Sequence, residues 1–234
     1  MDRIVRGFWG PREETVAELA PKWKATLDLL AELLPAAFAS QGESWMRIAD
    51  NGPAVEFPTD GPAVEAALRA ELEKDGWSDQ TGIAPSLMRR GEHSWQIEVS
   101  GRTGGVSEFL TQMVLIKMTS PDDAAVPETD LMARLSELWD PDYGDVSDPD
   151  TRKVFRERGG QVQPSVGRVG YLSSARAALV PDDLKAVSTV LTSGGVLLDI
   201  AAPGDHETAL AAHLRLRESG ALQPLPKPMD RSKL

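Results

Sequence analysis

Two different spacings of apolar residues alternate along this 234-residue chain, and they restrict its fold more than any other feature. Residues 94–100 place Trp95, Ile97 and Val99 at every second position, which is typical of a strand with one buried face. Residues 13–34 instead carry apolar side chains at intervals of three and four, as a helix packed on one side does. Because both patterns recur without an internal repeat or a low-complexity linker, we expect one α+β domain. Its sheet should be mixed or mostly antiparallel and flanked by helices.

The same spacings, with the turn residues between them, predict the individual elements. Strand patterns cover residues 3–9, 44–48, 54–57, 94–100, 109–118, 166–172 and 195–201. Helix patterns cover residues 13–34, 62–74, 128–139, 181–191 and 205–219. Residues 139–150, rich in Asp, Pro and Gly, predict a loop. We expect a single domain over residues 1–223, and the prolines of residues 224–234 predict a flexible tail.

Composition excludes several classes of function. The chain has no cysteine, which excludes a disulfide scaffold, a zinc finger and a thiol nucleophile. Its net charge is −11, whereas binding to nucleic acid or to anionic membranes depends on Lys and Arg. Residues 1–14 lack the apolar core of a secretion signal, and no stretch is apolar enough to span a membrane. We therefore expect a cytoplasmic protein that contacts neither nucleic acid nor a membrane directly.

The sequence contains no Gly-x-Ser-x-Gly elbow, no P-loop and no dinucleotide-binding glycine motif. Two patterns leave a metal-dependent hydrolase or nuclease open. Asp150, Asp183 and Lys185 fit a loose set of magnesium ligands with a lysine beside them. His206 and His213 lie seven residues apart on one predicted helix. Helix starts and ordinary packing also account for these residues, so we expect no catalytic residue, no cofactor and no metal ligand.

Negative charge is concentrated in residues 121–150, which contain ten acidic residues and one basic residue. Three interpretations are open for this segment: a solvated surface, a calcium loop built from its aspartates, and a face that binds a basic partner. The third predicts that aromatic anchors and acids contact the partner together. The residues expected to do so are Trp139, Asp140, Asp142, Tyr143, Asp145, Asp148 and Asp150.

Four segments follow one another in an order that is informative when they are taken together. They are Phe8-Trp9-Gly10-Pro11-Arg12 before a long helix, Trp139-Asp140-Pro141-Asp142-Tyr143-Gly144-Asp145-Val146, Val169-Gly170-Tyr171-Leu172, and the closing strand and helix over residues 194–222. In this combination the chain resembles the immunity protein 52 family of bacterial polymorphic toxin systems. The resemblance extends over nearly the whole chain.

The resemblance implies a function that composition does not. Proteins of this family are encoded beside a toxin, often a restriction-endonuclease-like nuclease delivered by contact-dependent or type VI secretion. They bind the toxin domain and block its active site, and no catalytic residues are known for them. The resemblance thus implies that the partner is a toxin domain encoded by the adjacent gene. We expect the acidic residues 139–150 to face the basic DNA-binding cleft of that toxin. A general protein-binding module without a toxin partner is the remaining alternative.

Overall fold

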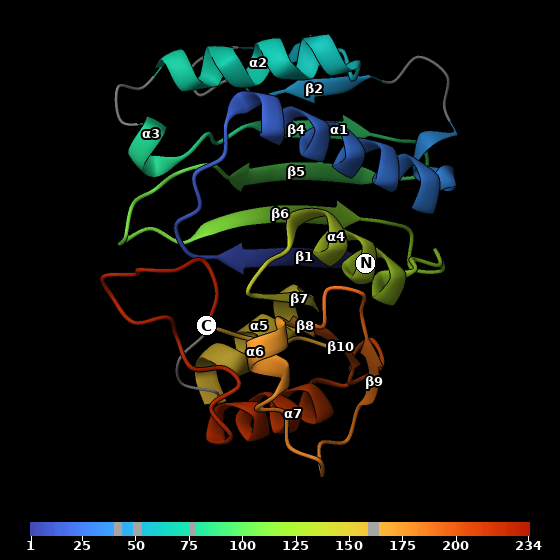
Figure 1. The fold of residues 1–234 in the computed structure, drawn as a ribbon. Helices are drawn as coiled ribbons and strands as arrows, with labels where there is room; N and C mark the ends of the chain where they lie inside the picture. The colour runs from blue at the N-terminus through green and yellow to red at the C-terminus, as the bar shows by residue number, and fades with distance from the viewer. Residues whose placement is uncertain (40–43, 49–52, 75–77, 159–163) are drawn as a thin grey trace.

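One sheet of antiparallel strands runs through the molecule (Figure 1). The computed structural model describes residues 1–39, 44–48, 53–74, 78–158 and 164–234. Within these residues, ten strands pair in the order β3-β2-β4-β5-β6-β1-β7-β8-β10-β9, and every neighbouring pair is antiparallel. The strands are β1 (Asp2–Trp9), β2 (Trp45–Arg47), β3 (Val55–Phe57), β4 (Ser86–Arg90), β5 (Gln96–Arg102), β6 (Gln112–Thr119), β7 (Tyr143–Ser147), β8 (Val169–Leu172), β9 (Val187–Val190) and β10 (Val196–Asp199). The prediction of one α+β domain with a mostly antiparallel sheet is confirmed.

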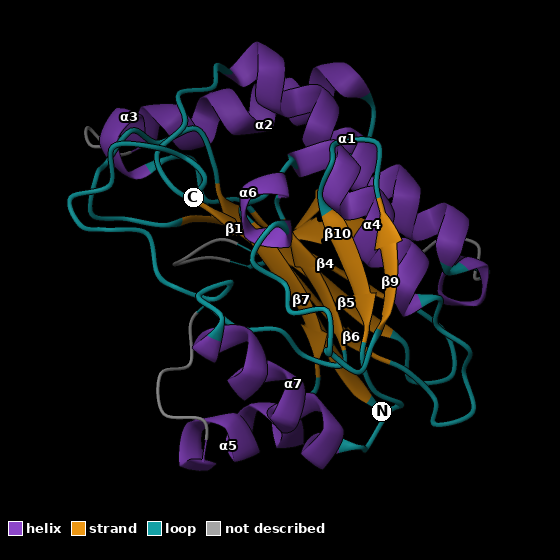
Figure 2. Cartoon of the chain, turned by 60° about the horizontal axis from the view of Figure 1, so that its bottom comes forward, coloured by secondary structure: helices purple, strands orange, loops and turns teal. Residues whose placement is uncertain are grey.

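Helices cover both faces of this sheet. Figure 2 shows α1, α2 and α4 on one side of it and α5 and α7 on the other. The helices are α1 (Val16–Leu33), α2 (Gly61–Lys74), α3 (Ser78–Thr81), α4 (Glu128–Trp139), α5 (Pro149–Arg158), α6 (Ser174–Ala177) and α7 (His206–Glu218), with a 3₁₀ turn, η1, at Pro35–Phe38. None of the described helices is long and apolar enough to cross a membrane.

The long helix α1 begins where a local signal in the sequence places its start. The Thr15 hydroxyl accepts a hydrogen bond from the backbone N–H of Glu18, and the Glu18 carboxylate accepts one from the backbone N–H of Thr15. This reciprocal capping box satisfies donors that the first helical turn leaves free. On the buried side of the helix, the Trp23 ring meets Trp139 edge-on at 5.3 Å between centroids, and Trp9 stacks on Trp139 at 5.8 Å. The three indoles lie in the larger hydrophobic core of the molecule.

The loop predicted for residues 139–150 is wrong, because part of this segment is a central strand. Strand β7 pairs with β1 on one side and β8 on the other, and all of its residues are buried. Gly144 lets β7 pack this closely against β1 and α4. A Cβ atom at this position would lie 2.7 Å from the carbonyl oxygen of Arg6 and 2.6 Å from Met132 Cε on α4. Helix α5 follows β7 directly, where no helix was predicted.

The helix predicted over residues 181–191 is also wrong. The backbone N–H of Leu184 donates to the carbonyl oxygen of Pro181, which closes a turn, and residues 187–190 continue as strand β9. The apolar spacing matched a helix, but the run Val187-Ser188-Thr189-Val190 is rich in β-branched residues that favour an extended chain. Strand β10, a buried partner of β9, is available beside it.

The segment over residues 224–234, predicted to be flexible, packs against the rest of the chain. The backbone N–H of Gly10 donates to the carbonyl oxygen of Ser232 at 2.8 Å, and that of Met229 donates to Glu108 at 2.7 Å. The Met229 side chain is buried. Prolines followed by polar residues favour a loose tail, but prolines also suit an extended segment that lies on a protein surface.

Replacing Met229 with Ala should therefore destabilise the protein, although Met229 lies in a segment that its sequence predicts to be loose. Truncating a buried Met to Ala typically costs about 2 kcal/mol or more. Urea unfolding of the wild type and the variant measures the difference. As a matched control, replacing the exposed neighbour Asp230 with Ala should change the free energy of unfolding by about 0.5 kcal/mol or less. Equal stability of the two variants would contradict a packed tail.

Candidate functional site

Four of the seven residues expected to contact a partner are buried. Trp139 and Asp142 are fully buried, and Tyr143 and Asp145 expose 5% and 1% of their surface. The indole N–H of Trp139 donates to Thr26 Oγ1 at 2.9 Å, so even its polar atom is directed inward. The expectation that these four side chains form an exposed binding face is wrong.

Asp145 is buried because a buried arginine neutralises it. Arg6 on β1 lies directly opposite Asp145 on β7, and its Nε and Nη2 atoms donate to the two carboxylate oxygens, each at 2.8 Å. Arg6 Nη2 also contacts Ser165 Oγ at 3.3 Å. A bidentate pair of this kind fixes both the distance and the orientation of the two groups. Asp145 therefore holds two neighbouring strands together instead of facing solvent.

Asp142 forms a second buried ion pair. It accepts hydrogen bonds from Arg176 Nη2 at 2.6 Å, from Ser173 Oγ at 3.0 Å and from the backbone N–H of Leu234 at 3.0 Å. Arg176 is also fully buried, and its Nη1 donates to two backbone carbonyl oxygens of the segment that precedes the tail. Asp140, which ends α4 in a left-handed conformation with φ of 47°, is half-buried and pairs with Lys233 at 2.6 Å. These contacts tie residues 140–142 to the C-terminal part of the chain.

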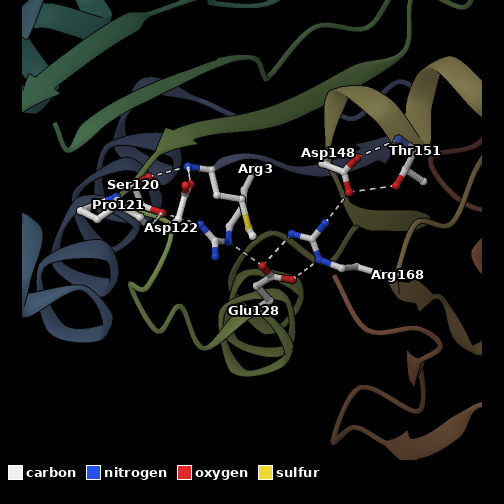
Figure 3. Close-up of polar contacts among 9 residues, drawn as sticks. Arg3, Ser120, Pro121, Asp122, Glu128, Asp148, Thr151 and Arg168 are labelled. Atoms are coloured by element: carbon white, nitrogen blue, oxygen red, sulfur yellow. Dashed lines mark hydrogen bonds and ion pairs between the residues drawn. The ribbon is translucent and has the colours of Figure 1, made fainter. Parts of the chain in front are cut away.

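Asp148 and Asp150, the last two residues of the predicted set, lie at the end of the sheet where β1 begins and β7 ends. Figure 3 shows a chain of polar contacts there, in which Glu128 lies between the guanidinium groups of Arg3 and Arg168. Arg168 Nη1 also donates to Asp148 Oδ2 at 2.8 Å. Asp150 is exposed beside this network in the first turn of α5.

Two adjoining pockets hollow this end of the sheet. The larger, of about 820 Å³, lies between the starts of β1 and α4 and the end of β10, and the smaller, of about 410 Å³, lies beside the starts of α5 and α7. Met1, Arg168 and Pro203 line both, so we treat them as one feature, the acidic hollow. Its lining contains seven carboxylates, from Asp2, Asp122, Glu128, Asp130, Asp148, Asp150 and Asp199.

Negative charge exceeds positive charge in the acidic hollow. Of the described residues, three contribute a cationic group to its lining, namely Met1 through its amino group and Arg3 and Arg168 through their guanidinium groups. Each of them already pairs with a carboxylate of the lining. Among the described residues, four exposed acids of the hollow form no salt bridge with any cation. They are Asp2, Asp130, Asp150 and Asp199.

Only part of this site can be predicted from the sequence. Asp130, Asp148 and Asp150 belong to the acidic segment and could be counted there, but Asp2 and Asp199 come from distant parts of the chain. Only the register of the sheet brings them together, because the start of β1 and the end of β10 lie at the same end. The number of acids in residues 121–150 therefore points to part of this site. The prediction that these acids share one continuous surface is wrong.

The residue sets predicted for a metal-dependent enzyme do not come together. Asp183 and Lys185 line a different pocket from Asp150, and Asp183 pairs with Arg215 at 2.9 Å. His213 is buried on the far part of α7, with its ring 4.7 Å from that of Phe155. His206 instead contacts Thr151 Oγ1 through Nδ1 at 2.8 Å.

The structure does bring Asp148, Asp150 and His206 together, with one ligand atom of each within 4.8 Å of the others. The surroundings of this cluster do not favour a cation. The Arg168 guanidinium is bound to Asp148, and all three residues lie at the starts of α5 and α7. The start of a helix carries partial positive charge, which attracts anions. Asp148 is better explained as a helix cap, since it accepts a hydrogen bond from the backbone N–H of Thr151 at 2.7 Å.

Replacing Arg6 with Met should destabilise the protein strongly, because it leaves the Asp145 carboxylate buried without its partner. Loss of one member of a buried pair typically costs about 3–5 kcal/mol. Denaturant unfolding checks the value. The double variant Arg6→Met with Asp145→Leu, which removes both charges, should recover part of the lost stability. If R6M is as stable as the wild type, the pair does not hold β7 in place.

Alkaline pH should unfold the protein as its tyrosines ionise. Burial raises the pKa of Tyr143 far above the ordinary value of 10.0, and burial raises the pKa of Tyr171 as well. The neutral phenols therefore stabilise the folded state fully below pH 10.0, and this stability is lost as the pH rises above the pKa of the unfolded chain. Tyrosinate absorbance should appear together with unfolding, and Tyr143→Phe should shift the transition to higher pH. Ionisation of both tyrosines in a protein that stays folded would contradict this.

Comparison with known proteins supports the fold and gives no information on the site. No protein-family model matches the sequence, and no curated protein matches it. Solved structures do match, among them the Pseudomonas aeruginosa T6SS protein PA0821, with a TM-score of 0.53 and 12% sequence identity. The match covers 94% of this chain and 73% of that one. At this level of identity the likeness concerns the fold alone, so this chain shares its fold with a T6SS protein.

Proposed function

We propose that this chain is an immunity protein that neutralises a secreted toxin by binding it, and that the acidic hollow is the surface that meets the toxin. The observation that carries the proposal is the excess of carboxylates in the hollow, four of them exposed and without a salt bridge. Positively charged surfaces of a partner would find complementary charge there. Complementary charge accelerates encounter and selects among partners.

The internal ion pairs of the hollow support a binding role over a purely solvated surface. Arg3 and Arg168 hold Glu128 and Asp148 in ion pairs, so these side chains of the lining are fixed in place before any partner binds. A preorganised surface loses less conformational entropy on binding than one built from mobile side chains. The four exposed acids of the lining form no salt bridge and are available to a partner.

The resemblance to the immunity protein 52 family adds the class of partner to the proposal. The toxin would be a restriction-endonuclease-like nuclease encoded by the adjacent gene, and the shared fold with a T6SS protein supports a link to type VI secretion. Such a nuclease holds its nucleic acid through Lys and Arg. The acids of the hollow would compete for those cations, and one bound chain would block one active site in the cytoplasm without any catalysis of its own.

Charge reversal in the hollow tests the proposal directly. The double variant Asp130→Lys with Asp150→Lys should weaken binding to the domain encoded by the adjacent gene by about tenfold or more, because two attractive charges become repulsive. The double variant Glu13→Lys with Glu73→Lys is the matched control. Glu13 and Glu73 are exposed acids that lie outside the hollow, and their reversal changes the net charge equally. Titration calorimetry at two salt concentrations measures both variants and the wild type.

Each outcome of this experiment has a separate meaning. Weaker binding of the hollow variant alone, with an affinity of the wild type that falls as salt rises, supports the proposed surface. Equal weakening of both double variants would mean that net charge matters and the hollow does not. A toxic neighbour that the wild-type chain neither binds nor neutralises in co-expression would overturn the function itself.

A further inference from the structure

Strand β9 forms one edge of the sheet and is exposed along its whole length. Val187 and Val190 expose 70% and 77% of their surface, and Figure 2 shows β9 at the rim of the sheet. Edge strands in monomeric proteins are usually protected by charged residues or prolines. The opposite edge, β3, has Glu56 in its middle, whereas β9 has neither a charge nor a proline. In the described part of the chain, no strand lies beyond β9.

The backbone of β9 presents hydrogen-bonding groups at this edge that no other described residue bonds. The N–H of Leu191 donates to the carbonyl oxygen of Gly195 at 2.9 Å, so Leu191 faces β10. Antiparallel strands bond through every second residue, and Thr189 therefore faces β10 as well. The N–H and C=O groups of Ser188 and Val190 point the other way, toward the open edge. Two donors and two acceptors are thus arranged as a template for a further strand.

This open edge is continuous with the acidic hollow. Val187, the first residue of β9, pairs with Asp199, the last residue of β10, and Asp199 lines the hollow. Asp199 is also one of the exposed acids without a salt bridge. A partner that places a basic surface in the hollow therefore lies beside the start of the exposed strand.

We infer that β9 is a docking edge, at which an extended, apolar segment of the basic partner adds a further strand to the sheet while its basic surface occupies the hollow. This inference rests on the function proposed above and names how the partner is held. Strand addition gains affinity from main-chain hydrogen bonds, and the side chains between them give specificity. The exposed valines would supply the apolar contacts.

Charge argues for such a partner over a second copy of this chain. Each copy carries a net charge of −11, so two copies repel each other as they approach. A stable interface needs about 1,000 Å² or more of buried surface, far more than a four-residue edge supplies alone. A basic partner instead gains the edge and the hollow in one contiguous interface.

Amide hydrogen exchange on the full chain, with and without the domain encoded by the adjacent gene, tests the inference. The amides of Ser188 and Val190 should exchange rapidly in the free protein and become at least about tenfold slower in the complex. The amide of Thr189 should be protected in both states, because it already faces β10. Thr189 therefore serves as an internal reference, and a pair of variants at Val190 separates strand pairing from simple burial of the edge.

A pair of variants at one position separates backbone pairing from side-chain contact. Val190→Pro removes the outward N–H, and proline is tolerated where an edge N–H faces solvent. It should weaken binding by about tenfold, whereas Val190→Thr, which keeps the N–H and the branched shape, should bind within about threefold of the wild type. Melting temperatures show whether each variant is folded. If V190P does not fold, the exchange of the Ser188 and Val190 amides in the wild-type complex tests the docking edge instead.

Unchanged exchange at Ser188 and Val190, with V190P binding as the wild type does, would overturn the docking edge. If D130K/D150K still weakens binding in that case, the proposed function stands without it. Failure of the wild type to bind the domain at all would remove the function and this inference together. Protection of the two amides in the free protein that grows with concentration would mean that a second copy occupies the edge, which also overturns the inference.

Discussion

Two buried arginine–carboxylate pairs hold the middle of this molecule together. Strand β7 is the junction of the sheet, with the strands from β3 to β1 on one side and β8, β10 and β9 on the other. Arg6 fixes β7 to β1 through Asp145, and Arg176 fixes the residues just before β7 through Asp142. A shift of β7 by one residue would turn Asp145 to the opposite face and separate it from Arg6. The pairs therefore specify the register on which both halves depend.

That register also builds the acidic hollow. With β7 in place, the end of β10 is carried to the same end of the sheet as the start of β1, and helices α4, α5 and α7 begin around them. Charges that are far apart in the sequence then meet at one surface. Within residues 121–150, the buried acids Asp142 and Asp145 hold the fold, whereas Asp130 and Asp150 stay exposed.

The sequence predicted best those elements whose apolar spacing was strict. The strand at residues 94–100 and the helices at 13–34, 62–74 and 128–139 all appear, because each buries one regular face. Strand β7 could not be predicted from its own residues, since its aspartate is tolerated only because Arg6, far away in the chain, lies opposite it. The same reason explains the errors at the site. A carboxylate looks equally polar in a sequence whether an arginine buries it or water surrounds it.

The position of β1 has a consequence for how the chain folds during synthesis. Strand β1 is a central strand of the sheet, and Arg6 and Asp145 are 139 residues apart. On the ribosome, β1 must wait with both edges open until β6 and then β7 emerge. Pairings between such distant segments slow folding and leave apolar strand edges exposed meanwhile. We therefore expect a slow folder whose nascent chain engages chaperones, and whose productive folding begins only after β7 has left the ribosome.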